Sequence, residues 1–246
     1  MLKILFSFYV WFIVLLTIVI YTPIFLVIWF LTVLFDRKLI LLHYFSNIWG
    51  SSYTWFIPGW NVKVMGKENR NFSSNKIYVA NHQSLEDIII IYRIGVPFRW
   101  VSKAEVFKIP VFGWLMHLKG DIKLKRSSKA SIKKMMTDAE KVLKKGCSLV
   151  IFPEGTRSRN GELGNFKEGA FALAHKTQKA LVPVVINGTI PNLIYSGFLF
   201  KMRHQVTVNI LPEIPYDSFK DKEYKEIAEM VKNIIKDELN RIKSEM

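Results

Sequence analysis

His82 and Asp87 are the two residues of this sequence whose types and spacing best suit acid–base chemistry. They lie five positions apart in VANHQSLEDIII, residues 79–90, at the foot of an apolar run. The preceding KIYVAN reads as a strand and the following LEDIIIIYRIG as a short helix. A histidine at the carboxyl end of a strand lies where open α/β sheets bind ligands. An aspartate in the next helical turn can fix its tautomer, so the pattern favours a general base held by a carboxylate.

The same aspartate also has a simpler interpretation as a helix cap. Ser84 with Asp87 three residues later matches a capping box, so the helix is expected to begin at Ser84. Capping accounts for Ser84 and Asp87 without any chemistry, but it leaves His82 unexplained. A serine-centred triad is less favoured, because Ser84 is only two residues from His82 and no G-x-S-x-G elbow occurs.

Three cationic residues follow other expected strands. Arg157 lies in the turn of SLVIFPEGTRSRNG, where Gly155 lets the backbone approach a ligand closely. Arg126 ends GDIKLKR, and Lys103 comes just after another strand. Each of these residues alone could be a solvated surface charge. Together with a base at His82 they indicate a site that acts on a phosphorylated molecule.

Short apolar segments alternate with helical patterns after residue 60. The expected strands are 62–65, 76–80, 98–102, 121–125, 148–152, 181–186 and 206–211. One amphipathic helix is expected in the lysine-rich stretch 127–146, and another over residues 224–239. This alternation predicts an α/β domain over residues 61–246, with a largely parallel sheet of about seven strands flanked by helices.

The first 60 residues predict a membrane anchor. No charged residue occurs from Ile4 to Phe35, and these 32 residues would form about 48 Å of helix against about 30 Å of hydrocarbon. One tilted span would fit, but a hairpin of two helices broken near Thr22-Pro23 is preferred, because proline disfavours helix at the residue before it. A soluble core helix is the remaining alternative. Residues 43–60 are rich in Trp and Tyr, which is typical of the headgroup region.

Flanking charges predict the orientation of that hairpin. Lys3 precedes the apolar segment and Arg37 and Lys38 follow it, so a hairpin would keep both basic ends on the cytoplasmic side. We therefore expect the protein at the cytoplasmic face of the inner cell membrane.

Charge and cysteine content narrow the partners. The net charge is +15, and the positive residues crowd into the chain after the apolar segment. A cationic body with an apolar end favours an anionic membrane leaflet or anionic substrates over nucleic acid. The single cysteine, Cys147, excludes an internal disulfide and fits a reducing compartment.

Four blocks in this order resemble the glycerolipid acyltransferase family, and most closely its PlsC-type branch of 1-acyl-sn-glycerol-3-phosphate acyltransferases. The blocks are NHQSLED, GDIKLKR, FPEGTRS and LVPVVI, and the resemblance covers roughly residues 60–210. It implies transfer of a fatty acyl chain from coenzyme A or acyl carrier protein to the hydroxyl of lysophosphatidic acid. It also implies a reaction with no cofactor, no metal and no acyl-enzyme.

The resemblance further assigns roles to residues. It implies that His82 is the general base and that Asp87 orients it. Leu85 and Glu86 stand at the variable positions of the first block and leave that pair intact. The implied substrate-binding residues comprise three cations on the phosphate and a turn that shapes the glycerol pocket: Lys103, Arg126, Arg157, Glu154, Gly155 and Thr156.

Two other functions stay open at this point. A membrane-bound phospholipid-binding protein without turnover would need the cations, but it would not need a histidine–aspartate pair. Acyl transfer to glycerol 3-phosphate or to another lysolipid would use the same pair. The compact length and the apolar N-terminal segment favour lysophosphatidic acid as the acceptor.

Overall fold

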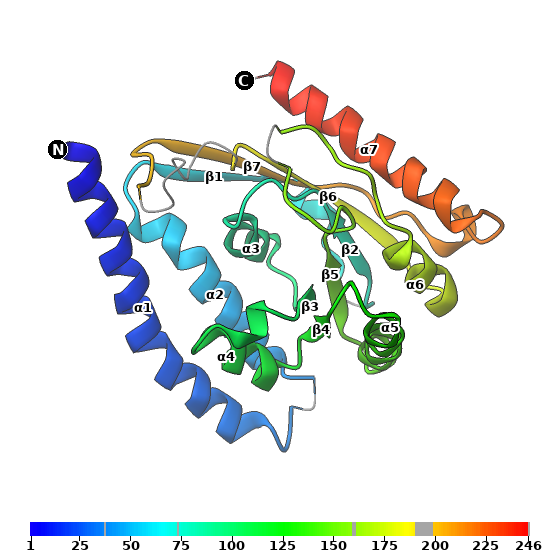
Figure 1. Ribbon diagram of the computed structural model, residues 1–246, viewed down its shortest axis with the longest axis horizontal. Helices are drawn as coiled ribbons and strands as arrows, with labels where there is room; N and C mark the ends of the chain where they lie inside the picture. Colours follow the sequence, from blue (N-terminus) through cyan, green and yellow to red (C-terminus); the bar gives the residue numbers. More distant parts are fainter. Residues whose placement is uncertain (37, 73, 159–160, 190–198, 246) are drawn as a thin grey trace.

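A computed structural model describes the chain except residues 37, 73, 159–160, 190–198 and 246. Its centre is a seven-stranded sheet in the order β1-β7-β6-β2-β5-β3-β4 (Figure 1). All neighbouring strands are parallel except the antiparallel pair β6 and β7. This confirms the predicted α/β class and the largely parallel sheet. The strands are Trp60–Met65 (β1), Ile77–Ala80 (β2), Phe98–Lys103 (β3), Ile122–Leu124 (β4), Ser148–Ile151 (β5), Leu181–Asn187 (β6) and His204–Ile210 (β7).

Helices cover both faces of the sheet. On one face lie α5 (Lys129–Lys144), α6 (Gly169–Thr177) and α7 (Tyr224–Ser244), whose apolar sides share one core cluster with the strands (Figure 1). On the other face, α3 (Asp87–Ile90) and the 3-10 turn η2 (Ile91–Ile94) pack in a second cluster. Next to them lie α2 (Ile40–Phe56) and α4 (Phe112–Lys119). The result is a three-layer domain.

The two amphipathic helices predicted from the sequence are α5 and α7. Helix α5 follows Ser128, whose side chain accepts a hydrogen bond from the backbone N–H of Ser131, and buries Met135, Ala139 and Leu143. Helix α7 opens with a capping box formed by Glu223 and Glu226. Both helices turn their apolar residues to the sheet because burial of that stripe, rather than helix propensity, stabilises them.

The N-terminal segment differs from the prediction. Helix α1 (Leu2–Thr32) runs through Pro23 without a break, so the predicted break near Thr22-Pro23 is wrong. A proline removes one backbone donor, whereas ending a helix inside an apolar run would leave several backbone groups unpaired. The chain turns instead between Thr32 and Ile40, where Asp36 and Lys38 lie; Arg37 is outside the described residues.

Helices α1 and α2 form an antiparallel pair. The Tyr9 hydroxyl near the start of α1 donates a hydrogen bond to the backbone oxygen of Phe56 at the end of α2. Farther along, the ring of Tyr21 meets the rings of Phe45 and Trp49 edge-on. The stretch predicted to lie at the headgroups is therefore mostly the second helix of this pair.

The outer side of α1 remains apolar and exposed. Among the described residues, α1 is the one helix long and apolar enough to cross a membrane. Its buried residues, Val10 and Ile13 among them, pack in a cluster with α2, while most of its large side chains face outward. Trp60 at the start of β1 belongs to the same cluster. The division of the chain at residues 60 and 61 stays a prediction.

Candidate active site

The predicted site residues follow the carboxyl ends of four neighbouring parallel strands. His82 follows β2, the turn of Glu154 to Arg157 follows β5, Lys103 ends β3 and Arg126 follows β4. Because these strands are parallel, all four ends lie at one edge of the sheet, here called the histidine edge (Figure 1). Residues distant in the sequence are thereby aligned along one edge.

His82 and Asp87 are in direct contact. The Nδ1 atom of His82 is 2.8 Å from Oδ2 of Asp87, and the aspartate is fully buried while the histidine side chain is 14% exposed. The imidazole stacks on the Phe152 ring with 4.2 Å between centroids. Since the carboxylate holds Nδ1, Nε2 is the nitrogen that can take a proton from a bound molecule.

The carboxylate of Asp87 caps the turn and holds the histidine at the same time. Besides His82, Oδ2 accepts the backbone N–H groups of Gln83 at 2.6 Å and Ser84 at 2.8 Å. Asp87 therefore has both of the roles that the sequence predicted, as a cap and as the partner of His82. The expected start at Ser84 is wrong, however, because α3 begins at Asp87 and the Ser84 Oγ accepts from the Glu86 N–H at 3.3 Å instead of completing the box.

Thr189 completes the surroundings of Asp87. Its hydroxyl donates to Oδ1 of Asp87 at 2.6 Å, and the residue is fully buried. Thr189 comes two residues after β6, which lies beside β2, so the sheet order brings the two residues together. Sequence analysis missed this residue. The sequence feature that could have indicated Thr189 is its hydroxyl just past the carboxyl end of the LVPVVI strand.

Glu86 is a second buried acid in this turn. Its Oε2 atom is 2.9 Å from Nε2 of His204 on β7, and both side chains are almost fully buried. A residue at a variable position of the first block thus ties the α3 turn to β7.

Glu154 braces the backbone of the histidine edge. Its Oε1 accepts the backbone N–H of His82 at 2.7 Å, and its Oε2 accepts that of Gly164 at 2.8 Å. Burial raises the pKa of this carboxyl, and the two N–H donors partly oppose the rise. Both oxygens are thus engaged by the chain itself. The predicted role of Glu154 in shaping a glycerol pocket stays a prediction.

Gly155 allows a cation to lie against the turn. Its φ of +70° is in the left-handed region, and a Cβ there would lie 3.2 Å from Cε of Lys167. Lys167 is exposed and is anchored by its backbone N–H, which donates to the Pro153 oxygen at 2.9 Å. Sequence analysis did not single out Lys167. It stands thirteen residues after Glu154, and only the returning chain brings it to the turn.

The remaining predicted residues lie at different distances from His82 along the edge. Arg157 and Thr156 are exposed, and the next residue, Ser158, donates its N–H to the His82 oxygen at 2.8 Å. Lys103 is exposed and 3.8 Å from Glu105. The exposed Arg126 follows β4, three strands from β2, or about 14 Å between strand axes. The structure therefore brings Arg157 close to His82 and leaves Arg126 farthest away.

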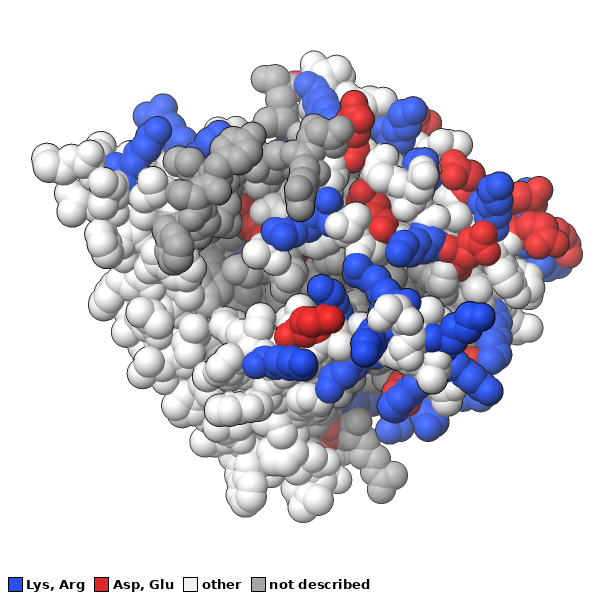
Figure 2. Space-filling view, in the orientation of Figure 1, with Lys and Arg blue, Asp and Glu red and all other residues white. Residues whose placement is uncertain are grey.

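The surface divides into a charged and an uncharged part. In Figure 2 Lys and Arg side chains gather over the centre and right of the molecule, with Asp and Glu among them on the right. The side where α1 lies is almost free of charge, apart from a few blue side chains at the upper left, near the start of that helix. A cationic site next to an apolar flank suits a substrate that is anionic at one end and apolar at the other.

Comparisons with known proteins show the family of the chain. A model of the Acyltransferase family matches residues 61–187. A chloroplastic 1-acyl-sn-glycerol-3-phosphate acyltransferase of Arabidopsis thaliana is 40% identical over 148 residues, which cover 60% of this chain and 41% of the relative. An enzyme of the same name from Borreliella burgdorferi is 30% identical over 189 residues, 76% of this chain and 75% of the relative. The crystal structure of the 1-acyl-sn-glycerophosphate acyltransferase PlsC from Thermotoga maritima superposes with a TM-score of 0.83 and 29% identity, covering 98% of this chain and 96% of that one.

The fold and the site define an α/β domain with a largely parallel sheet and a histidine–aspartate pair at its strand ends. The chain belongs to the Acyltransferase family. It spans about half the length of several relatives that it matches, from Arabidopsis thaliana, Brassica napus and Chlamydomonas reinhardtii.

Proposed function

We propose that this protein transfers a fatty acyl chain from a thioester to the sn-2 hydroxyl of 1-acyl-sn-glycerol 3-phosphate, giving phosphatidic acid. The observation that carries the proposal is the 2.8 Å contact between His82 and the buried Asp87 at the cationic edge of the sheet. The names of the relatives and the likeness to the Thermotoga PlsC structure support the same acceptor.

The proposed chemistry needs one base. Nε2 of His82 removes the proton of the acceptor hydroxyl while the oxygen attacks the thioester carbonyl carbon. The tetrahedral intermediate then collapses, the carbon–sulfur bond breaks, and the imidazolium returns the proton to the leaving thiolate. Asp87 keeps Nδ1 protonated and stabilises the imidazolium between these steps. Since coenzyme A or acyl carrier protein brings a good leaving group, the reaction as proposed uses no cofactor, no metal and no acyl-enzyme.

Phosphate binding is assigned to the cations of the histidine edge. We place Arg157 on the phosphate first, because it lies in the turn whose next residue bonds to His82, with Lys103 and Arg126 as outer contacts. The turn of Glu154, Gly155 and Thr156 would then shape the glycerol pocket. Such contacts position the hydroxyl against the thioester, which is where an enzyme of this type gains much of its rate.

The acceptor would come from the membrane in which α1 and α2 anchor the protein. Helix α1 packs on the rest of the chain along its length: the Ser7 hydroxyl accepts the Phe200 N–H, and Tyr21 lies against α2. A helix held in this way cannot cross a bilayer independently, so we place the pair in the cytoplasmic leaflet of the inner membrane, with both ends on the cytoplasmic side. A cysteine at residue 2 in a Cys147→Ser background should then be labelled only after the cytoplasmic face is opened. Labelling from outside intact cells would contradict this arrangement.

The reaction is tested by product analysis. Purified protein is incubated with lysophosphatidic acid, glycerol 3-phosphate or other lysolipids, and with either acyl-coenzyme A or acyl carrier protein as donor. We expect phosphatidic acid as the main product and a loss of about two to four orders of magnitude in rate for folded His82→Ala. A different acylated product would overturn the acceptor, and full activity of His82→Ala would overturn the mechanism.

A further inference from the structure

A hollow lies at the end of the sheet opposite His82. Strand β1 runs against the direction of β2, since β1 is parallel to β7 and β7 is antiparallel to β6. The residues that follow β1 therefore lie near the amino ends of β2 and β3. There α2, β1, η2 and the residues just after β1 line an open hollow of about 340 Å³, here called the α2 hollow. Its lining residues include Tyr44, Asn47, Ile48, Trp55, Lys67, Arg70 and Arg93.

Asn47 is the first sign that the α2 hollow is a binding site. Its side chain is buried, with only 8% of the residue exposed, yet neither its amide oxygen nor its amide nitrogen has a hydrogen-bond partner among the described residues. A buried amide without partners destabilises the folded protein. Buried polar groups are normally paired, so an unpaired amide on the wall of a hollow leaves a donor and an acceptor for a molecule that binds there.

Two arginines without acidic partners are the second sign. Within the described part of the chain, no carboxylate forms an ion pair with Arg70, Arg93 or Lys67. Burial lowers the pKa of both arginines, and the charge of Arg70 lowers the pKa of Arg93 further. Unneutralised cations gathered in one place favour an anion.

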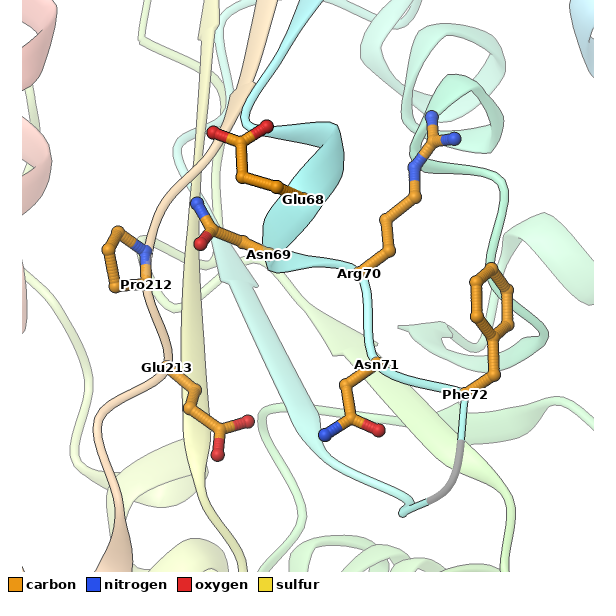
Figure 3. A pocket seen from close by; sticks show the side chains of 7 residues that line it. All are labelled: Glu68, Asn69, Arg70, Asn71, Phe72, Pro212 and Glu213. Carbon is orange, nitrogen blue, oxygen red and sulfur yellow. The ribbon is translucent and has the colours of Figure 1, made fainter.

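The acids closest in the sequence do not serve these arginines. Figure 3 shows the adjoining hollow, in which the guanidinium of Arg70 points away from the carboxylates of Glu68 and Glu213. Glu213 is already paired with Lys76. Arg70 turns instead toward η2, where it donates to the Arg93 backbone oxygen at 3.0 Å and packs over Gly95.

The rim of the α2 hollow is apolar and is formed by α2, one of the two helices that we propose as the membrane anchor. Tyr44, Ile48 and Trp55 are exposed on one face of α2, and the guanidinium of Arg93 lies 6.0 Å from the centroid of the Trp55 ring. Helix α2 is paired with the exposed apolar helix α1. A ligand with an anionic head and an apolar tail can therefore enter from the same bilayer that receives α1.

We infer that the α2 hollow binds the phosphate of an anionic membrane phospholipid, with Lys67, Arg70 and Arg93 on the phosphate, Asn47 on a headgroup or glycerol oxygen, and Ile48 and Trp55 against the acyl chain. This site is separate from the histidine edge and does not depend on the reaction proposed there. It would fix the angle at which the anchored domain sits on an anionic leaflet.

The test titrates the detergent-solubilised full chain with dihexanoyl phosphatidylglycerol or dihexanoyl phosphatidylcholine and counts bound lipid by native mass spectrometry. We expect the anionic lipid to bind at least about tenfold more tightly, as charge-assisted contacts predict. The double variant Lys67→Gln/Arg93→Gln should lose about that factor. Arg70 is left unchanged because it also holds the η2 backbone.

Two controls separate this site from others. Lys222→Gln/Lys225→Gln removes the same charge from an exposed part of the chain and should bind as wild type does. Arg157→Ala should also bind normally, because it lies at the other edge of the sheet. A melting curve of each variant checks the fold.

Four results would overturn the inference. They are equal binding of both lipids, unchanged binding by the Lys67→Gln/Arg93→Gln variant, an equal loss in the Lys222→Gln/Lys225→Gln control, and loss of binding on Arg157→Ala. One further measurement tests whether the bound phosphate belongs to a lipid. If inorganic phosphate displaces the lipid at the concentration at which the lipid itself binds, the apolar rim contributes nothing and the ligand is not a lipid.

Discussion

Around Asp87 the chain supplies all the partners itself, whereas the cations that extend from the neighbouring strand ends have few partners of their own. Four donors fill the two oxygens of the buried carboxylate, from His82, Gln83, Ser84 and Thr189. Arg157 and Arg126, by contrast, are exposed, and no ion pair to either occurs within the described residues.

This contrast indicates which geometry must be fixed before substrate arrives. A base has to meet its proton at hydrogen-bond distance, so its orientation is built into the core. A phosphate can be gathered by mobile, solvated side chains and neutralised on binding. Removing a partner of Asp87 should therefore damage catalysis itself, while removing a cation should damage substrate binding.

The largest effect is expected for Asp87→Asn. An amide has a single acceptor oxygen, so it cannot serve all four donors, and it lacks the charge that stabilises the imidazolium. We expect kcat to fall by about two to four orders of magnitude. The melting temperature should fall as well, because the same carboxylate caps α3. Activity is therefore compared well below the melting transition. A folded variant with wild-type kcat would contradict the contrast drawn here between Asp87 and the exposed cations.

Arg157→Ala should act on the acceptor. Loss of one charge-assisted contact to phosphate costs on the order of 1.5–3 kcal/mol, which corresponds to about 10–150-fold in kcat/KM for lysophosphatidic acid. The KM for the acyl thioester should change much less. Equal losses for both substrates would assign this arginine to the donor.

A smaller effect on catalysis is expected for Thr189→Val. The variant keeps the side-chain shape but removes the hydroxyl that donates to Oδ1, while the three donors to Oδ2 remain. We expect kcat to fall by about tenfold, in line with one hydrogen bond to a charged group. Thr189→Ser should restore most of it. An unchanged kcat in the valine variant would show that the Oδ2 contacts alone hold Asp87.

Arg126→Ala should have the smallest effect. Its strand lies three places from β2, so its contact with phosphate would be long and screened by water. We expect a change of about two- to threefold in KM for lysophosphatidic acid, clearly below that of Arg157→Ala. If the two variants lose the same factor, the phosphate lies midway along the edge and the assignment of Arg157 as the inner cation is wrong.

Local patterns in the sequence were sufficient for the strands, for the two amphipathic helices α5 and α7 and for the histidine. All seven strands fall where short apolar runs predicted them, because the period of side-chain burial is written into neighbouring residues. The His82–Asp87 contact was also predictable, since a spacing of five residues across a strand end needs no distant partner. The four blocks added the family, and the structure agreed with it.

The tertiary structure decided which distant residues meet. Thr189 reaches Asp87 only because β6 lies beside β2, and Glu154 reaches the backbone of His82 only because β5 lies on the other side. Strand order depends on how whole layers pack, and no local pattern records it. The unbroken course of α1 was likewise decided by its surroundings and not by the local sequence. Proline disfavours helix locally, but the loss of backbone hydrogen bonds in an apolar segment and the packing of α1 against α2 outweigh that preference.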